Sequence, residues 1–147
     1  MSRRPLTEVT CALIVQHERI LVAQRSEQMP HPLKWEFPGG KLRKGETPEN
    51  CIAREIQEEL GVDIHVEDSL PSIKHYYPGH TVRLLPFVCR IRKGEVVLRE
   101  HKSHRWVRFE DLTKVDWLEA DVGVVQLWNH SMAYRRGSPS GAADRSR

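Results

Sequence analysis

The sequence has few cysteines, few aromatic side chains and no long hydrophobic segment. Only three of its 147 residues are cysteine, and 7% are aromatic. Cys11, Cys51 and Cys89 are widely spaced and each lies in an apolar stretch, so we expect buried free thiols, not a disulfide framework or a metal site. Free thiols are typical of a reducing compartment, and we therefore predict a cytoplasmic protein.

No apolar run approaches the length of a membrane span. The longest covers residues 11–15, whereas a transmembrane helix needs about 20 residues. Polar Thr7 and Glu8 stand where a secretory signal would be apolar, so we expect neither a leader nor a membrane partner. Hydrophobic residues at 39% and charged residues at 29% are typical of a folded globular domain and exclude a disordered chain.

Basic charge is not in excess except at the C-terminal end. The net charge is +3, and residues 135–147 carry all of it, with four arginines against one aspartate. Residues 1–134 are neutral overall, which argues against a nucleic-acid-binding protein. We predict one domain over residues 1–134 and a disordered basic tail over 135–147, because the tail has too few apolar side chains to build a core.

The apolar pattern predicts strands around one well-marked helix. Strand signals lie at residues 9–15, 20–23, 62–66, 73–77, 82–90, 96–98 and 105–107, and Pro86 suggests an edge or a bulge. Residues 47–61 carry helix signals, with Thr47 as N-cap, Pro48 in the first turn and Gly61 at the end. The expected buried stripe of this helix consists of Ile52, Ala53, Ile56 and Leu60.

A second helix is expected after Asp121. Because few strands alternate with helices, we predict an α+β architecture with a mixed sheet and packed helices.

Three glutamates form a second stripe on the first helix. Glu55, Glu58 and Glu59 stand at positions i, i+3 and i+4, so they fall within an arc of about 100°. Carboxylates this close repel one another unless a cation lies among them, and oxygen ligands suit Mg²⁺ or Mn²⁺. Taken alone, the stripe is more typical of a solvated acidic helix face than of a metal site.

The residues around the stripe have the spacing of a known motif. From Gly40 the chain runs through five residues to Glu46, and then through seven to Arg54-Glu55-Ile56-Gln57-Glu58-Glu59-Leu60-Gly61-Val62. This order resembles the Nudix box, G-x5-E-x7-R-E-U-x-E-E-x-G-U with U aliphatic, at every position. The resemblance implies the Nudix fold, a mixed β-sheet sandwiched between helices.

The resemblance also implies roles for the residues of the box. The metal, Mg²⁺ with Mn²⁺ as a substitute, would be held by Gly39, Glu55, Glu58, Glu59 and Glu100. Arg54 would clamp one of the carboxylates, and Glu46 would hold the loop against the helix or assist the metals. Gly40 and Gly61 would be structural. Either Glu55 or Glu100 would be the general base, and the sequence leaves this choice open.

Over roughly residues 8–130 the chain resembles the MutT-like branch, the nucleoside triphosphate pyrophosphohydrolases. Trp35-Glu36-Phe37-Pro38-Gly39-Gly40-Lys41 is similar to the lead-in of that branch. The expected substrate-binding residues are Arg25, Phe37, Lys41, His80, Trp117 and Asp121. Trp117 would stack on the base. Asp121 would read the base edge or, as the alternative, cap the second helix. Asp121 also stands where MutT itself has asparagine, which leaves the base preference open.

The expected reaction is the Mg²⁺-dependent hydrolysis of a nucleoside triphosphate to a monophosphate and pyrophosphate. Oxidised dGTP is the first candidate substrate, CTP or dCTP the second, and the 5′ end of triphosphorylated RNA the third. The partner is a nucleotide, with nucleic acid only in the third case, and the chain is a monomer or dimer. A catalytically silent, nucleotide-sensing Nudix module is the alternative from another class, although such modules usually lose box carboxylates that this chain keeps.

Four histidines fit no standard zinc spacing, and we expect them to be exposed loop residues: His75, His80, His101 and His104.

Overall fold

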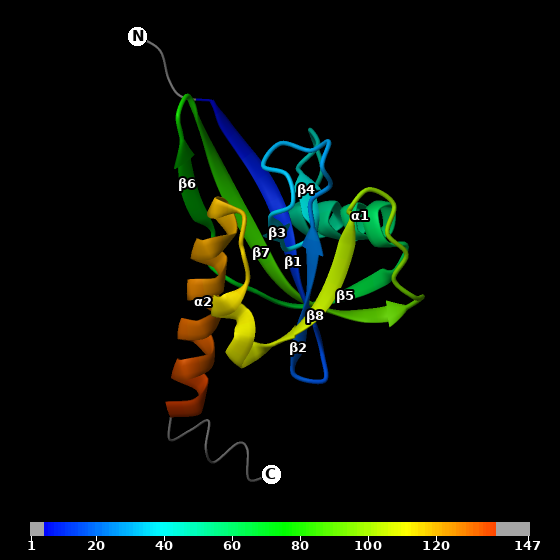
Figure 1. The fold of residues 1–147 in the computed structure, drawn as a ribbon, viewed down its shortest axis with the longest axis vertical. Coiled ribbons are helices and arrows are strands. Elements are labelled where there is room, and N and C mark those ends of the chain that lie inside the picture. Colours follow the sequence, from blue (N-terminus) through cyan, green and yellow to red (C-terminus); the bar gives the residue numbers. More distant parts are fainter. Residues whose placement is uncertain (1–4, 138–147) are drawn as a thin grey trace.

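Eight strands, two α-helices and one 3-10 helix make up the described part of the computed structural model, residues 5–137 (Figure 1). The elements follow one another as β1 (Leu6–Gln16), β2 (Arg19–Gln24), β3 (Trp35–Glu36), β4 (Gly39–Lys41), α1 (Pro48–Leu60), β5 (Asp63–Ser69), β6 (Ile73–Tyr77), β7 (His80–Lys93), β8 (Ser103–Arg108), η1 (Phe109–Lys114) and α2 (Glu119–Gly137). Strands β1 and β7 pair in parallel, and the other pairings are antiparallel. The predicted α+β architecture with a mixed sheet is confirmed.

Strand β1 divides the interior into two hydrophobic cores. Its side chains alternate, so Cys11 and Leu13 pack with α2 while Ala12 and Ile14 pack with α1. Figure 1 shows the two helices on opposite sides of the sheet. Every strand position near the centre of β1 is thus buried, which explains why residues 11–15 read as a continuous apolar run.

Helix α1 begins and ends where the sequence predicts. The Thr47 side chain accepts a hydrogen bond from the Asn50 backbone N–H over 3.1 Å, and Gly61 adopts a left-handed φ of 69° and donates to the Gln57 carbonyl. The buried stripe differs from the predicted one in one place. Ala53 is exposed, and the buried positions besides the predicted isoleucines and leucine are Cys51 and Glu59.

Two strand predictions are wrong. Residues 96–98 form no strand and lie instead along the end of α1, where the Val97 N–H donates to the Leu60 carbonyl over 2.9 Å. Pro86 lies in the interior strand β7, neither at an edge nor opposite a register shift, since the nearer shift in the β5–β7 pairing is opposite Val88 and Cys89. On one side, strand β7 pairs with β6 up to Leu84 and with β5 from Phe87 onward, and Pro86 lies between these two pairings. The Pro86 carbonyl accepts from the Leu70 N–H on that side, so the N–H that proline lacks would face the junction between β6 and β5.

Helix α2 begins at Glu119, two residues before Asp121, and continues to Gly137, beyond the predicted domain end at 134. The rest of the predicted tail, residues 138–147, lies outside the described residues. Neither of the described helices combines the length and apolar character that would let it cross a membrane. The three cysteines are free and buried, as predicted.

Candidate active site

The Gly39–Gly40 segment runs between β1 and α1, and both glycines are needed for close approach. A Cβ at Gly39 would overlap the backbone carbonyl of Thr10 on β1, because β4 pairs directly with that strand. A Cβ at Gly40 would overlap the carboxylate of Glu55 on α1. The first residue of the box thus lies against the first of its helical carboxylates.

Arg54 ties the loop of the box to the helix. Its Nε and Nη2 donate to the two carboxylate oxygens of Glu46 over 2.6 and 2.9 Å, a bidentate pair. The hydrogen bonds from Arg54 and from the Arg43 backbone N–H lower the pKa of Glu46 to about 2. Glu46 is therefore ionised at neutral pH, and it fixes the loop that enters α1.

The same guanidinium reaches two further carboxylates. Nη1 of Arg54 lies 3.0 Å from Oε1 of Glu58 and 3.4 Å from Oε2 of Glu55. Glu58 is exposed and also lies 3.5 Å from Arg43, whereas Glu55 is half-buried and its burial raises its pKa. The arginine thus offsets the mutual repulsion of the glutamate stripe.

Glu59 is the buried member of the stripe. Its side chain is 10% exposed, and Oε1 has no hydrogen-bond partner. Burial raises the pKa of Glu59 to about 9, with further contributions from the nearby carboxylates of Glu55, Glu36 and Glu100. A hydrogen bond from the Gly39 backbone opposes this shift. A buried carboxylate that has one oxygen without a partner and lies among other acids is stabilised by a proton or a cation.

The donor set of this cluster fits Mg²⁺, which prefers carboxylate and carbonyl oxygens. Within residues 5–137, no three His, Cys, Asp or Glu side chains converge closely enough to form a ready-made metal site, and Glu58 and Glu55 instead contact Arg54.

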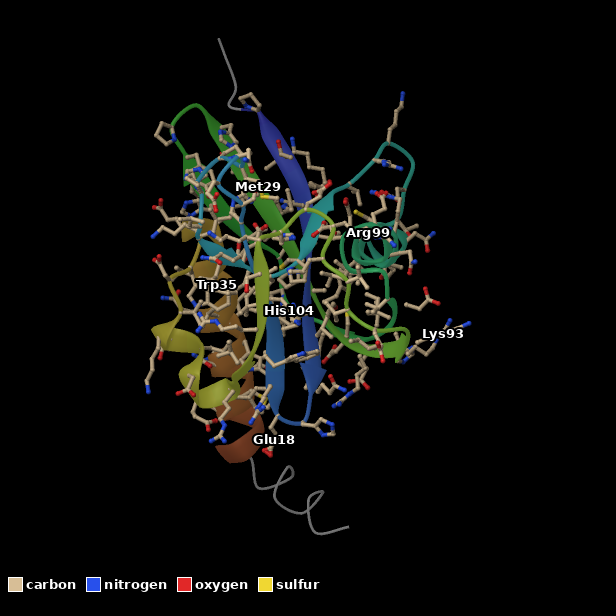
Figure 2. The ribbon with its side chains drawn as sticks, turned by 45° about the vertical axis from the view of Figure 1, so that its right-hand side comes forward. Glu18, Met29, Trp35, Lys93, Arg99 and His104 are labelled. Atoms are coloured by element: carbon tan, nitrogen blue, oxygen red, sulfur yellow. The ribbon has the colours of Figure 1, made fainter. Side chains whose placement is uncertain are left out.

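The loop between β7 and β8 brings Glu100 and His101 to the cluster. The Arg99 backbone N–H donates to the Glu59 carbonyl over 3.3 Å, and the Arg99 guanidinium reaches the Glu58 carbonyl. Figure 2 shows Arg99 beside the end of α1. Glu100 is exposed, and its charge contributes to the raised pKa of Glu59.

A cavity of about 450 Å³ opens between β1, β7 and the start of α2. It is lined by five of the predicted substrate-binding residues, together with Gly39: Arg25, Phe37, Lys41, His80 and Asp121. Its size and its mixture of apolar walls with a few polar groups are typical of a small-molecule site. Gly39 lines the cavity and its neighbour Gly40 lies against Glu55, so the glycine pair connects the cavity to the carboxylate cluster.

Asp121 lies in the cavity wall and does not cap a helix. It is 4% exposed, and its Oδ2 accepts a hydrogen bond from the Phe37 backbone N–H over 2.7 Å. Burial raises the pKa of Asp121, as does the charge of Glu36, while the bond from Phe37 opposes the shift. The helix-cap alternative is wrong, since α2 has already begun at Glu119.

Trp117 does not reach the cavity. Its ring packs on Phe37 with the centroids 4.6 Å apart, and its indole N–H donates to the Leu112 carbonyl over 2.7 Å. The expected stacking of Trp117 on a bound base is therefore not met. Trp117 supports Phe37 from behind, and Phe37 itself lines the cavity.

Sequence reasoning assigned no role to three residues of the cavity, His31, Glu36 and Tyr77, although Glu36 lies in the Trp35–Lys41 segment singled out above. Glu36 accepts from Arg25 over 2.9 Å, while Tyr77 stacks between His31 and His80 with centroid distances of 5.8 and 5.1 Å. These residues come from the loop after β2, from β3 and from the end of β6, which only the fold brings together.

The histidine expectations are largely wrong. His101 is buried, and its Nε2 lies 2.8 Å from Oε2 of Glu36. His75, His80 and His104 lie on strands β6, β7 and β8, not in loops.

Comparison with known proteins identifies families and relatives to which the chain is similar. The family described as NUDIX domain matches residues 5–127. The putative 8-oxo-dGTP diphosphatase 2 of Mycobacterium tuberculosis is 36% identical over 118 residues, 78% of this chain and 82% of that protein. The CTP pyrophosphohydrolase of Escherichia coli K12 is 28% identical over 135 residues, 92% and 98% of the two chains. The solution structure of MutT from methicillin-resistant Staphylococcus aureus 252 has a TM-score of 0.69 and 40% identity, covering 84% of this chain and 95% of that one.

Proposed function

The chain belongs to the Nudix hydrolases, enzymes of acid anhydrides, and from this we propose that it is a Mg²⁺-dependent nucleoside triphosphate pyrophosphohydrolase that prefers oxidised dGTP. The products would be a nucleoside monophosphate and pyrophosphate. The three free, buried thiols support a reducing, cytoplasmic location.

One observation carries the proposal, namely the meeting of the cavity and the carboxylate cluster at the Gly39–Gly40 segment. A nucleotide whose base enters the cavity toward Asp121 would have its phosphates near Lys41 and Arg25, which supply positive charge. The same placement brings the phosphate chain to the side of Glu55 that faces Gly40. In this proposal, residues around Asp121 would recognise the base, and the carboxylate cluster on the other side of the Gly39–Gly40 segment would hydrolyse the phosphate chain.

The remaining roles, metal binding and proton transfer, fall to the carboxylate cluster and the neighbouring Gly39. Gly39, Glu55, Glu58, Glu59 and Glu100 would hold the metal. When bound, Mg²⁺ would neutralise phosphate oxygens and lower the pKa of the attacking water. We assign proton acceptance to Glu55, because partial burial raises its pKa toward the working range of a general base and its carboxylate lies against Gly40. Arg54 would keep Glu55 and Glu58 in place through the contacts described above.

Asp121 supports the preference for oxidised dGTP. Oxidation adds an N7–H donor to guanine, and a carboxyl group in the cavity wall can accept from it. Burial favours the protonated carboxyl, which can also donate to a carbonyl oxygen of the base. CTP is the second candidate, because the relative that matches 92% of this chain is named for CTP and the cytosine amino group is also a donor.

The test is a hydrolysis assay on the purified protein with oxidised dGTP, the unmodified NTPs and dNTPs, ADP-ribose and triphosphorylated RNA. We expect the highest kcat/KM with oxidised dGTP, monophosphate and pyrophosphate as products, and loss of activity in EDTA. Inorganic phosphate as the product, or full activity in EDTA, would contradict the mechanism. The highest kcat/KM with CTP or RNA would contradict the substrate assignment alone.

A further inference from the structure

Two buried polar atoms face each other beside the carboxylate cluster, and neither has a hydrogen-bond partner. They are Nδ1 of His101 and Oε1 of Glu59, which lie 3.9 Å apart on side chains that are 3% and 10% exposed. That distance is too long for a direct hydrogen bond. Buried polar groups are nearly always satisfied, so this pair requires an explanation.

The other ring nitrogen of His101 determines what Nδ1 can do. Nε2 lies 2.8 Å from Oε2 of Glu36, and the second oxygen of Glu36 accepts from Arg25 over 2.9 Å. A carboxylate paired with arginine can only accept, so Nε2 must carry the hydrogen. In the neutral imidazole, Nδ1 then presents a lone pair to Glu59, so two acceptors face each other once Glu59 is ionised, as it must be to bind a metal.

A metal cation satisfies both acceptors. Bonds from a metal to imidazole nitrogen and to carboxylate oxygen are each about 2.0–2.2 Å long, so two adjacent ligands of one ion lie about 3 Å apart at a right angle and about 3.5 Å apart at the tetrahedral angle. The observed 3.9 Å is slightly longer, so the two side chains must approach each other a little to share one ion. In addition, metal-bound histidines nearly always donate their other N–H to a carboxylate or carbonyl, which is the position that Glu36 occupies.

We propose that Nδ1 of His101 and Oε1 of Glu59 bind a transition metal ion, so that the site prefers Mn²⁺ to Mg²⁺. Imidazole nitrogen is a favourable ligand for transition metals, whereas Mg²⁺ demands oxygen. The inference rests on the proposed function in one respect, since Glu59 belongs to the metal cluster there. It goes further by adding a nitrogen ligand from outside the box. It also connects the metal to Arg25 in the nucleotide cavity through Glu36.

Pulsed electron paramagnetic resonance of Mn²⁺ bound to the unaltered protein tests this without any variant. We expect modulation from a directly coordinated ¹⁴N nucleus, replaced by the ¹⁵N pattern when only histidine is labelled. Bound Mn²⁺ that shows no histidine nitrogen would overturn the proposal. Hydrolysis measured with Mg²⁺ on the same protein separates the outcomes, because activity without the nitrogen signal defeats this inference and leaves the proposed function intact.

Metal affinity measured by titration provides the second test. His101→Gln keeps an amide near the position of Nε2 but removes Nδ1, so we expect Mn²⁺ binding about tenfold or more weaker and Mg²⁺ binding nearly unchanged. His104→Gln is the matched control. His104 lies three residues later, on β8 (Figure 2), and both affinities should stay at the unaltered values. Equal Mn²⁺ affinity in His101→Gln and the unaltered protein would overturn the proposal.

Discussion

The backbone N–H of Phe37 donates to Oδ2 of Asp121 over 2.7 Å, although 84 residues separate the two. The bond ties the first turn of α2 to the segment that leads into Gly39 and Gly40. Phe37 and Asp121 both line the cavity. The same hydrogen bond therefore fixes the position of Asp121 in the cavity wall and of the segment that leads to the carboxylate cluster.

Asp121→Asn tests base recognition. Asparagine retains an oxygen that can accept from Phe37, so the melting temperature should change little, but the carboxyl group that faces the base is lost. We expect the ratio of kcat/KM for oxidised dGTP to that for CTP to shift at least about tenfold, or about 1.4 kcal/mol. Asp116→Asn, at an exposed residue paired with Lys34, is the control and should leave the ratio unchanged. An unaltered ratio in Asp121→Asn would show that Asp121 does not recognise the base and has only a structural role.

Glu58→Gln tests the metal cluster. Turnover should fall by orders of magnitude because a metal ligand is lost. The variant loses only exposed ion pairs to Arg54 and Arg43, so its stability should change by less than about 1 kcal/mol. The control is Glu49→Gln in the first turn of the same helix, which should retain full turnover. Steady-state kinetics and thermal unfolding measure both effects, and an active Glu58→Gln would remove this residue from the mechanism.

Gly40→Ala tests the contact between the glycine turn and Glu55. The added Cβ would overlap the Glu55 carboxylate, so we expect a loss of kcat with a smaller change in KM. Gly45→Ala provides the opposite case. Gly45 has open space around it but a φ of 81°, so alanine should cost about 1–2 kcal/mol of stability and leave kcat intact. Equal kcat in both variants would show that Glu55 tolerates displacement.

Glu59→Gln tests the buried carboxyl group through pH. Burial raises the pKa of Glu59 from 4.5 to about 9, so the folded protein binds a proton that the unfolded chain releases between these values. Stability of the metal-free protein therefore falls as pH rises through this window, and glutamine removes that loss. In EDTA, the melting temperature of Glu59→Gln should exceed that of the unaltered protein more at pH 8 than at pH 5. A difference that is the same at both pH values would contradict the raised pKa.

Local sequence signals were sufficient for helix α1 and for the box that it carries. Thr47, Pro48 and Gly61 act through hydrogen bonds and backbone angles within a few residues, so their effect is readable from the chain itself. The strands that pair in sequence, β1 with β2, were predictable for the same reason. Burial of the three cysteines followed from the apolar stretches around them.

Only the tertiary structure decided which polar residues are buried and what they contact. His101 reaches Glu36 across 65 positions, and Asp121 reaches Phe37 across 84. Spacing along the chain carries no information about such contacts, because they depend on how β3, the β7–β8 loop and α2 are packed around β1. For the same reason the sequence could not show that Phe37 lines the cavity while Trp117 packs behind it. Nor could it show that Glu59 is buried while Glu58 is exposed. The sequence thus determined which carboxyl, imidazole and guanidinium groups the chain carries. Packing determined which of these groups are buried and how burial shifts their pKa values.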